Sequence, residues 1–367
     1  VDAAEWLQQT LATLNAFNNV TLANRCTATG YYDHNLVVMS ERVSDYLGPS
    51  APEDMPRQRL WKVRAAQIVL ATGAIERPLV FPNNDRPGIM LASAVRHYVN
   101  RYAVTPGKRV VIFANNDNAY RTALDLHAVG ITVQAVIDVR DSTQGTWIEQ
   151  TREAGIHILN NHHVVNTRGR KGLRAVKVAP FGYTQNRAAF WLKCDLLAMS
   201  GGWNPVVHLY SQSGGVLDFV DSDGVFVPLQ QNYLHTAGSI NGTWTLPECL
   251  SEGVRAGATA VKCAGFVDED THASILPTVD PIVESTMLPV WNSVATQDAK
   301  QWIDFQHDVT VSDVHLASRE NFVSVEHFKR YTTTGMSIDQ GKTSNINGLA
   351  ILAKVLDKTI PEVGTTK

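Results

Sequence analysis

The fold is decided by residues 109–140, which read RVVIFANNDNAYRTALDLHAVGITVQAVIDVR. The stretch begins with a continuously apolar run (109–114) and continues with a helical pattern (120–128). After Gly130 it ends in a second strand pattern (132–139). Strand, helix and strand within about thirty residues are typical of a βαβ unit, whose two strands are parallel. The stretch therefore predicts a Rossmann-like α/β domain.

The turn after the first of these strands departs from the usual dinucleotide fingerprint. That fingerprint, G-x-G-x-x-G/A, lets a pyrophosphate approach the N-terminus of the helix. The corresponding residues here are Ala114, Asn116 and Ala119, and the asparagine narrows the space for a phosphate. Asp138 stands where the ribose-binding carboxylate belongs. These four residues are candidate nucleotide contacts; the alternative is a Rossmann-like unit that serves packing and subunit contacts.

Outside this unit, two segments carry the small residues at which flavoprotein chains cross a bound dinucleotide. The apolar strand pattern 67–71 runs into Thr72 and Gly73, and residues 236–242 read TAGSING. Flavoproteins of this type place an aspartate after the glycine of the second segment, where it contacts the flavin ribityl chain. Ser239 stands there instead, which counts against a standard flavin and leaves room for a nicotinamide dinucleotide. The candidate cofactor-binding residues of these crossings are Thr72, Gly73, Gly238, Ser239, Asn241 and Gly242.

The order of these patterns predicts an α/β protein with the two-dinucleotide-binding-domain flavoprotein fold, of the FAD/NAD(P)-binding, Rossmann-like type. Whether the second Rossmann-like unit binds a nucleotide stays open. A helix (3–17) and short strands between 20 and 64 precede the first crossing, and composition shifts to Pro, Ser, Thr and Asp at 268–301. Capping chemistry at 310–313 opens a helical end. The predicted division is as follows: 1–105, the remainder of an N-terminally truncated first dinucleotide-binding domain with a β-meander; 106–199, an inserted second Rossmann-like domain; 200–265, a return to the first domain; 266–300, a linker; 301–367, a small helical domain.

Composition narrows the function. Of 367 residues, 44% are hydrophobic and 18% charged, which describes a folded globular protein. The net charge of −3 predicts neither nucleic acid nor an anionic membrane as partner. The four cysteines lack paired spacing, so we expect reduced thiols in the cytoplasm and no metal site. No residue run is long and apolar enough to span a membrane, and no signal peptide is apparent. No nucleophile-elbow motif occurs, and we assign no catalytic residue.

Three stretches resemble one family: ATGAIERPLVFPNNDRPGIMLASAVRHYVNRY (71–102), SGGWNPVVHLYSQSGG (200–215) and VEHFKRYTTTGMSIDQGKTSN (325–345). They resemble the alpha (large) subunit of heterotetrameric sarcosine oxidase, of which the chain looks like a central fragment. The resemblance implies an upstream region with the first G-x-G-x-x-G and a downstream folate-binding domain, so the chain alone is expected to be inactive. It further implies NAD in this subunit, FAD in a beta subunit that oxidises sarcosine, FMN near their interface, gamma and delta subunits, and tetrahydrofolate as acceptor.

Related opine and cyanide-producing oxidases hold an iron–sulfur cluster on four cysteines in the C-terminal helical domain. The corresponding positions here are Asp304, Gln306, Asp339 and Ser344, and cluster ligation needs thiolates. We therefore expect no cluster. Two other functions remain open: a subunit of an opine or amino-acid oxidase, which the missing cysteines disfavour, and a non-catalytic scaffold with a vestigial nucleotide site.

Overall fold

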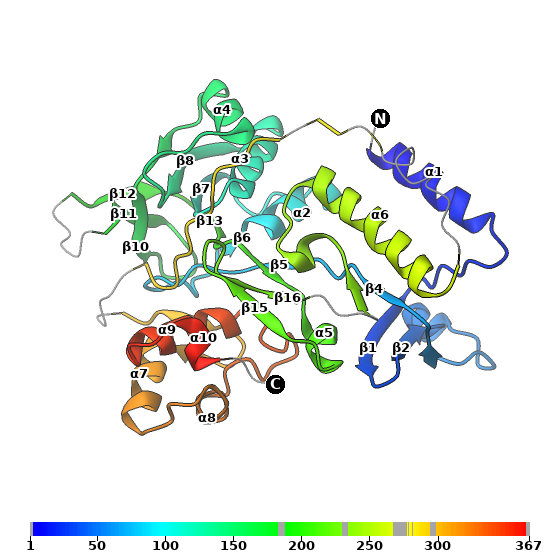
Figure 1. Cartoon of the computed structure of the whole chain (residues 1–367). Coiled ribbons are helices and arrows are strands. Elements are labelled where there is room, and N and C mark those ends of the chain that lie inside the picture. The colour runs from blue at the N-terminus through cyan, green and yellow to red at the C-terminus, as the bar shows by residue number, and fades with distance from the viewer. Residues whose placement is uncertain are drawn as a thin grey trace.

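A parallel sheet of five strands, ordered β6-β13-β7-β8-β9, is the largest sheet of the computed structural model (Figure 1). The structure describes residues 3–182, 188–229, 234–266, 277, 279–280, 282–293 and 299–364. The strands are β6 (Ile89–Leu91), β13 (Leu196–Ser200), β7 (Arg109–Ala114), β8 (Thr132–Asp138) and β9 (Ile158–Leu159). Helices α2 (Ala92–Tyr102), α3 (Asn118–Ala128) and α4 (Thr146–Glu153) cover one face, and the meander β10 (His162–Arg168), β11 (Ala175–Pro180) and β12 (Phe190–Lys193) covers the other.

Strand β7 explains why the stretch 109–114 is apolar throughout. Val110 and Ile112 pack in the cluster formed with the three helices, whereas Val111 and Phe113 pack in the cluster formed with the meander. Alternate side chains of a strand point to opposite faces, so a strand covered on both sides needs apolar residues at every position. All four side chains are fully buried.

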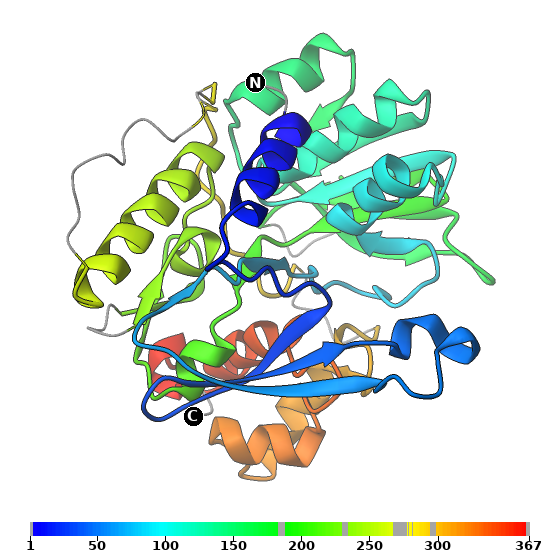
Figure 2. The same cartoon turned by 90° about the vertical axis from the view of Figure 1, so that its right-hand side faces the viewer.

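A smaller parallel pair, β4 (Ile68–Leu70) and β17 (Leu234–Thr236), forms a second layer with helix α6 (Leu246–Cys263). The antiparallel pair β5 (Ala74–Glu76) and β14 (Trp203–Pro205) connects this layer to the large sheet. The antiparallel sheet β1–β3 and helix α4 lie at opposite ends of the molecule (Figures 1 and 2). The other elements of this part are α1 (Ala3–Asn15), β1 (Cys26–Tyr32), β2 (Leu36–Arg42), η1 (Asp45–Ser50), β3 (Gln58–Arg64), α5 (His208–Gln212), β15 (Leu217–Val220), β16 (Val225–Pro228) and η2 (Gly238–Asn241).

The helical character of the C-terminal region is confirmed, and its described residues form four helices, one more than the sequence predicted. They are α7 (Val311–Arg319), α8 (Val325–Thr332), α9 (Asn345–Val355) and α10 (Ile360–Val363), preceded by the short pair β18 (Trp302–Asp304) and β19 (Val309–Thr310). The predicted capping chemistry is confirmed, because Asp313 Oδ2 accepts from the Thr310 amide at 2.8 Å and from its hydroxyl at 2.7 Å. None of the helices in the described ranges is long and apolar enough to cross a bilayer.

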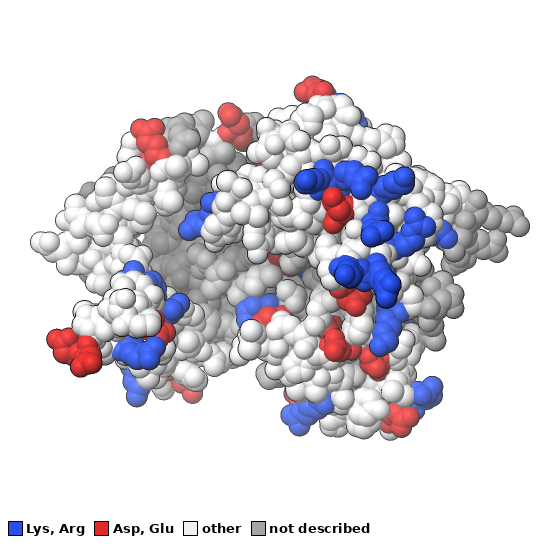
Figure 3. All heavy atoms as spheres, turned by 180° about the vertical axis from the view of Figure 1, so that it is seen from behind, with Lys and Arg blue, Asp and Glu red and all other residues white. Residues whose placement is uncertain are grey.

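The α/β class, the parallel Rossmann-like sheet and the helical C-terminal region are confirmed. A strand is not found at 20–22, the first of the short strands expected from residue 20 onward: this segment is irregular and follows a turn that the Val20 amide closes by donating to Phe17 O. The predicted linker (266–300) falls partly outside the described residues, and its longest described stretch (282–293) lies against the large sheet. Figure 3 shows Lys and Arg gathered on one half of the rear face, with Asp and Glu among and below them, so the charge there is mixed.

Candidate cofactor site

The two predicted crossings meet where β4 and β17 end side by side. The strands are parallel, with Leu70 opposite Thr236, and the Ala237 amide donates to Leu70 O at 3.0 Å. The carboxyl ends of parallel strands share one edge of a sheet, which is where open α/β sheets bind ligands. A Cβ added to Gly73 would lie 4.0 Å from Ser239 Oγ, with no other neighbour so near. A side chain added at Gly73 would therefore come into contact with the second crossing.

Backbone bonds fix the first crossing. Gly73 has a φ of +73°, a conformation that glycine adopts without steric cost. Its carbonyl oxygen accepts from the Val206 amide at 2.9 Å, and the Thr72 hydroxyl donates to Val206 O at 2.7 Å. The chain is thus held at the edge where Ser239 approaches from the other side.

One carboxylate holds the second crossing, and sequence reasoning missed it. Glu252 on α6 accepts from the Gly238 amide and from Asn241 Nδ2, both at 2.8 Å, and also from the Thr243 hydroxyl. Burial would raise the pKa of Glu252, but these three hydrogen bonds lower it below its usual value. Gly242 ends the turn in the left-handed conformation, at a φ of +77°. The only sequence signal for Glu252 is an acidic residue near the start of the helix that follows the turn.

A cavity of 980 Å³ opens beside these crossings. Three of the ten predicted cofactor residues line it: Ser239 and Gly242 from the η2 turn and Asn116 from the large-sheet unit. The indole rings of Trp203 and Trp244 also line it. The cavity therefore lies between the smaller parallel pair and the five-stranded sheet.

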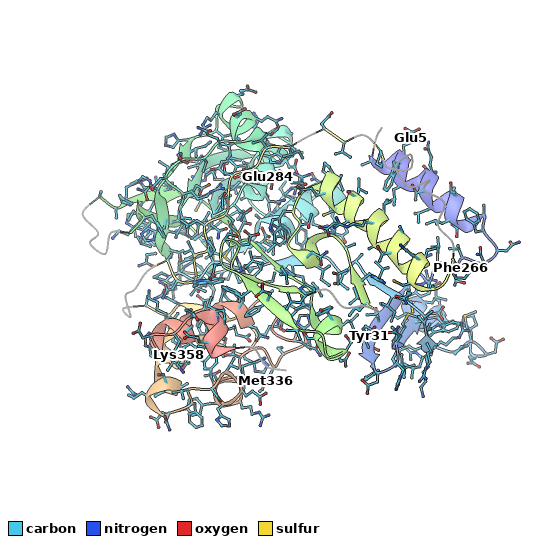
Figure 4. The ribbon with its side chains drawn as sticks, in the orientation of Figure 1. Glu5, Tyr31, Phe266, Glu284, Met336 and Lys358 are labelled. Atoms are coloured by element: carbon cyan, nitrogen blue, oxygen red, sulfur yellow. The ribbon has the colours of Figure 1, made fainter. Side chains whose placement is uncertain are left out.

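The cavity is acidic. Its ionisable lining in the described chain consists of Arg255 and five carboxylates: Asp117, Asp223, Glu248, Glu252 and Glu284. Burial, with the nearby charge of Asp117, raises the pKa of Glu284. Figure 4 labels Glu284 on the segment that crosses the α3 end of the large sheet. Such a lining favours a cationic or hydrogen-bond-donating group over a phosphate.

Asp138, the predicted ribose-binding carboxylate, does not line this cavity. It is 0% exposed, and its Oδ2 accepts from the Tyr120 hydroxyl at 2.8 Å and from Arg140 Nη2 at 2.7 Å. Arg140 Nη1 also pairs with Asp117 Oδ1 at 2.7 Å. Burial would lower the pKa of Arg140, but the two carboxylates outweigh that effect and raise it. Asp138 therefore has no oxygen free for a ribose in this arrangement.

The other predicted residues of the large-sheet unit also face inward. Ala114 and Ala119 are fully buried in the core between sheet and helices. The side chain of Asn116 donates to Ser200 Oγ at 2.9 Å, and its Oδ1 accepts from the Asn118 amide at 3.1 Å. Of these four candidates, Asn116 alone reaches the cavity in the described structure.

A second cavity, of 430 Å³, lies between α5 and the helices α8 and α9. Its lining is mostly apolar, with the cationic or basic side chains of Lys329, Lys342 and His208. Burial lowers the pKa of Lys329, and burial together with the two lysines lowers that of His208. Asn345 Oδ1, buried beside this cavity, has no hydrogen-bond partner in the described part of the chain. The cavity therefore combines apolar walls with basic side chains, and its described lining includes no carboxylate, although Glu326 and Asp339 lie near enough to act on these groups.

Three of the four positions that correspond to cluster cysteines come together around one carboxylate. Asp304 accepts from the Gln306 amide at 2.9 Å, from the Gly335 amide at 2.8 Å and from the Ser344 hydroxyl at 3.2 Å. Asp339 instead accepts from the backbone of its own turn. Among the described residues, no three His, Cys, Asp or Glu side chains are grouped so that they could hold a metal ion. The absence of an iron–sulfur cluster stays a prediction.

Known proteins resemble the chain along its whole length. The sarcosine oxidase subunit alpha of Corynebacterium sp. (strain P-1) is 40% identical over 376 aligned residues, which cover 100% of this chain and 38% of the relative. That of Rhizobium meliloti (strain 1021) is 37% identical over 365 residues, 99% of this chain and 36% of the relative. The chain thus spans between a third and two fifths of the length of these relatives.

The fold also has a close counterpart among solved structures. L-proline dehydrogenase from P. horikoshii superposes with a TM-score of 0.67 and 18% identity, over 99% of this chain and 65% of the other. A family model described as the sarcosine oxidase A3 domain matches residues 298–367, which include helices α7–α10. Along its whole length the chain is therefore homologous to the alpha subunit of sarcosine oxidase, and its C-terminal region belongs to the sarcosine oxidase A3 domain family.

Proposed function

We propose that this chain contributes a NAD site and a subunit-interface scaffold to an oxidoreductase complex that oxidatively demethylates sarcosine to glycine. The observation that carries the proposal is the 37–40% identity to sarcosine oxidase alpha subunits over the whole chain. The proposed complex contains beta, gamma and delta subunits, with FAD in the beta subunit and tetrahydrofolate as acceptor of the released carbon. Amine oxidation belongs to the beta subunit, so no residue of this chain is given a catalytic role.

The same proposal includes the division into 1–105, 106–199, 200–265, 266–300 and 301–367, and a cytoplasmic location. Strand β6 lies within the first of these segments (1–105) yet pairs with β13 in the large sheet, so the chain crosses between layers near residue 89. The cytoplasm is supported by four cysteines, Cys26, Cys194, Cys249 and Cys263, that are all unpaired.

The crossings at β4 and β17 fit NAD better than a flavin. Gly73 places no side chain at this edge of the strands, and Ser239 offers a hydroxyl where flavoproteins have a carboxylate. The acidic cavity beyond them suits the positively charged nicotinamide ring of NAD⁺ and disfavours its phosphates, which we place at the strand ends. When bound, NAD supplies a ring that accepts or donates a hydride. Residues 72–73 and 238–242 would hold it.

We predict that Glu252→Ala lowers NAD retention about tenfold, the cost of one lost hydrogen-bonded contact. The carboxylate organises the η2 turn, and its removal leaves the Gly238 amide and Asn241 without their acceptor. Because the pKa of Glu252 is below its ordinary 4.5, the contribution is complete above pH 4.5 and is lost as pH falls through the lowered pKa. NAD retention after rapid desalting at a series of pH values measures both effects. Glu248→Ala is the matched control, since Glu248 lines the same cavity but, among the described residues, accepts its side-chain hydrogen bond from the Thr245 hydroxyl and none from the η2 turn.

The second cavity fits FMN at the interface with the beta subunit. Its apolar walls suit a planar ring, and Lys329 and Lys342 suit a phosphate. We expect the double variant Lys329→Ala, Lys342→Ala to lose at least about nine tenths of the FMN of the complex, measured by absorbance and mass spectrometry after denaturation. Lys358→Ala is the control, because Lys358 is exposed in the same region and does not line the cavity (Figure 4). Unchanged FMN content in the double variant would remove this cavity from the proposal.

The test of the reaction is a substrate panel on the complex purified from its natural source. In the proposed reaction sarcosine, O₂ and water give glycine, formaldehyde and H₂O₂, and tetrahydrofolate captures the formaldehyde unit. We expect sarcosine to be oxidised faster than proline or any opine, with free formaldehyde falling when tetrahydrofolate is added. A preference for an opine would move the chain to the rival oxidase function.

A scaffold function is the second candidate, and the buried Asp138 favours it for the large-sheet unit. In that case the complex would release flavin on denaturation but no NAD.

A further inference from the structure

The large sheet has its own ligand position, at the point where the order of its strands reverses. Strand β7 lies between β13 on one side and β8 on the other, and all three are parallel. Open α/β sheets bind dinucleotides in the crevice beyond the carboxyl ends of the strands at this place. Residues 115–117 follow β7, and Gly201 follows β13, so these residues border the crevice.

Residues 282–290, which we name the strap, lie across this crevice (yellow in Figure 1). The Leu288 amide donates to Asn115 O at 3.1 Å, and Asn115 Nδ2 donates back to Leu288 O at 2.8 Å. At the other end, the Thr146 amide donates to Val283 O at 3.0 Å, and the Val283 amide donates to Thr146 Oγ1 at 3.2 Å. The strap is thus bonded in both directions at both ends of the crevice.

Two amides at the start of α3, where a phosphate would bind, already have acceptors in the protein. Asn116 Oδ1 accepts from the Asn118 amide and Asp117 O accepts from the Tyr120 amide, whereas the carboxylate of Asp117 makes no capping hydrogen bond to the helix. Asp117 Oδ2 accepts from the Ser285 amide of the strap at 2.7 Å, and Asp117 Oδ1 pairs with Arg140. Negative charge, helix terminus and strap are therefore joined in one buried network.

Glycine at position 145 permits this close approach. Its φ is +145°, and a Cβ there would lie 2.6 Å from Val283 O and 3.0 Å from Asp117 Oδ2. At Gly155, beyond the other end of α4, φ is also positive (+74°), but a Cβ would meet nothing within 4 Å. The two glycines differ in whether the strap lies against them.

We infer that the strap is the permanent occupant of the dinucleotide crevice of the large sheet, so that this unit takes no nucleotide. Its role is positional: residues 284–287 of the strap form one wall of the acidic cavity, and the network of Asp117 and Arg140 holds that wall in place. The hydrogen bonds between the strap and the crevice do not depend on the proposed function. The inference rests on that function in one respect, which is that NAD is taken as the ligand of the acidic cavity.

Hydrogen–deuterium exchange on the natural complex, with and without saturating NAD⁺ or NADH, tests the occupancy. We expect peptides from 282–290 to exchange slowly and at the same rate with either nucleotide. Faster exchange of the strap on adding nucleotide, together with new protection at 114–119, would show displacement from a working site and overturn the inference. The measurement reports on the strap even if the complex contains no NAD, so failure of the proposed function is seen separately.

The paired variants Gly145→Ala and Gly155→Ala test the holding role. Gly145→Ala should speed exchange of the strap at least about tenfold by forcing it from the crevice, and should lower NAD retention. Gly155→Ala, which also places a side chain at a positive φ but makes no strap contact, should change neither. Equal exchange of the strap in the two variants would contradict the role assigned to it.

Discussion

Arg140→Met is expected to lower the free energy of unfolding of the large-sheet region by about 3–5 kcal/mol, the usual cost of leaving buried charges unpaired. Arg140 is 6% exposed and bridges Asp138, which is 0% exposed, to Asp117, which is 2% exposed. Methionine fills a similar volume but leaves both carboxylates without their cation. Urea denaturation followed by tryptophan fluorescence measures the loss.

Two comparisons identify the cause. Arg330→Met removes a surface pair in which the side chains of Arg330 and Glu326 are 71% and 47% exposed, and should cost at most about 1 kcal/mol. Adding Asp117→Asn and Asp138→Asn to Arg140→Met should restore much of the stability, because no unpaired charge then remains buried. A loss below about 1 kcal/mol in Arg140→Met would show that the network is not what holds the end of the sheet.

Gly73→Trp is expected to reduce the NAD content of the complex below about a tenth of the wild-type value. The only atom within 4.0 Å of an added Cβ is Ser239 Oγ, so the indole would project into the space between the two crossings. The positive φ of Gly73 adds strain of about 1–3 kcal/mol for any other residue. NAD released by acid and quantified by mass spectrometry measures the effect.

Gly130→Trp separates exclusion from strain. Gly130 has a φ of +79°, and an added Cβ there would meet nothing within 4 Å. It lies between α3 and β8, at the amino ends of the parallel strands and away from the carboxyl ends at which we place NAD. This variant should keep its NAD. If both variants lost NAD, the loss in Gly73→Trp would be due to backbone strain or general destabilisation rather than to exclusion of NAD from its site.

The parts of the fold that the sequence predicts are those in which side chains determine the structure. Strand β7 and its helix α3 were predictable because a strand buried on both faces must be apolar throughout. The cap of α7 was predictable because Thr310 and Asp313 bond locally. Helix α4 was missed because it is short and polar, with only Ile148 and Thr151 buried.

The candidate site was predictable only in part, for a different reason. Gly73 and Ser239 could be found because their residue types suit a close ligand, and the structure brings them together. The strap could not be found, because it is held through backbone groups, and 66% of the Val283 side chain is exposed. Asp138 lies where a ribose-binding carboxylate belongs in the sequence. Its ion pair with Arg140, which occupies the carboxylate, depends on the three-dimensional structure of the strand end and could not be predicted from the sequence.

The most direct test of the proposed function is the nucleotide content of the natural complex. We would denature the complex and identify and count the released nucleotides by mass spectrometry. One NAD per copy of this chain, together with flavin, is the result we predict, since the strap leaves a single dinucleotide site. Flavin without NAD would contradict the NAD site and leave the chain as a scaffold.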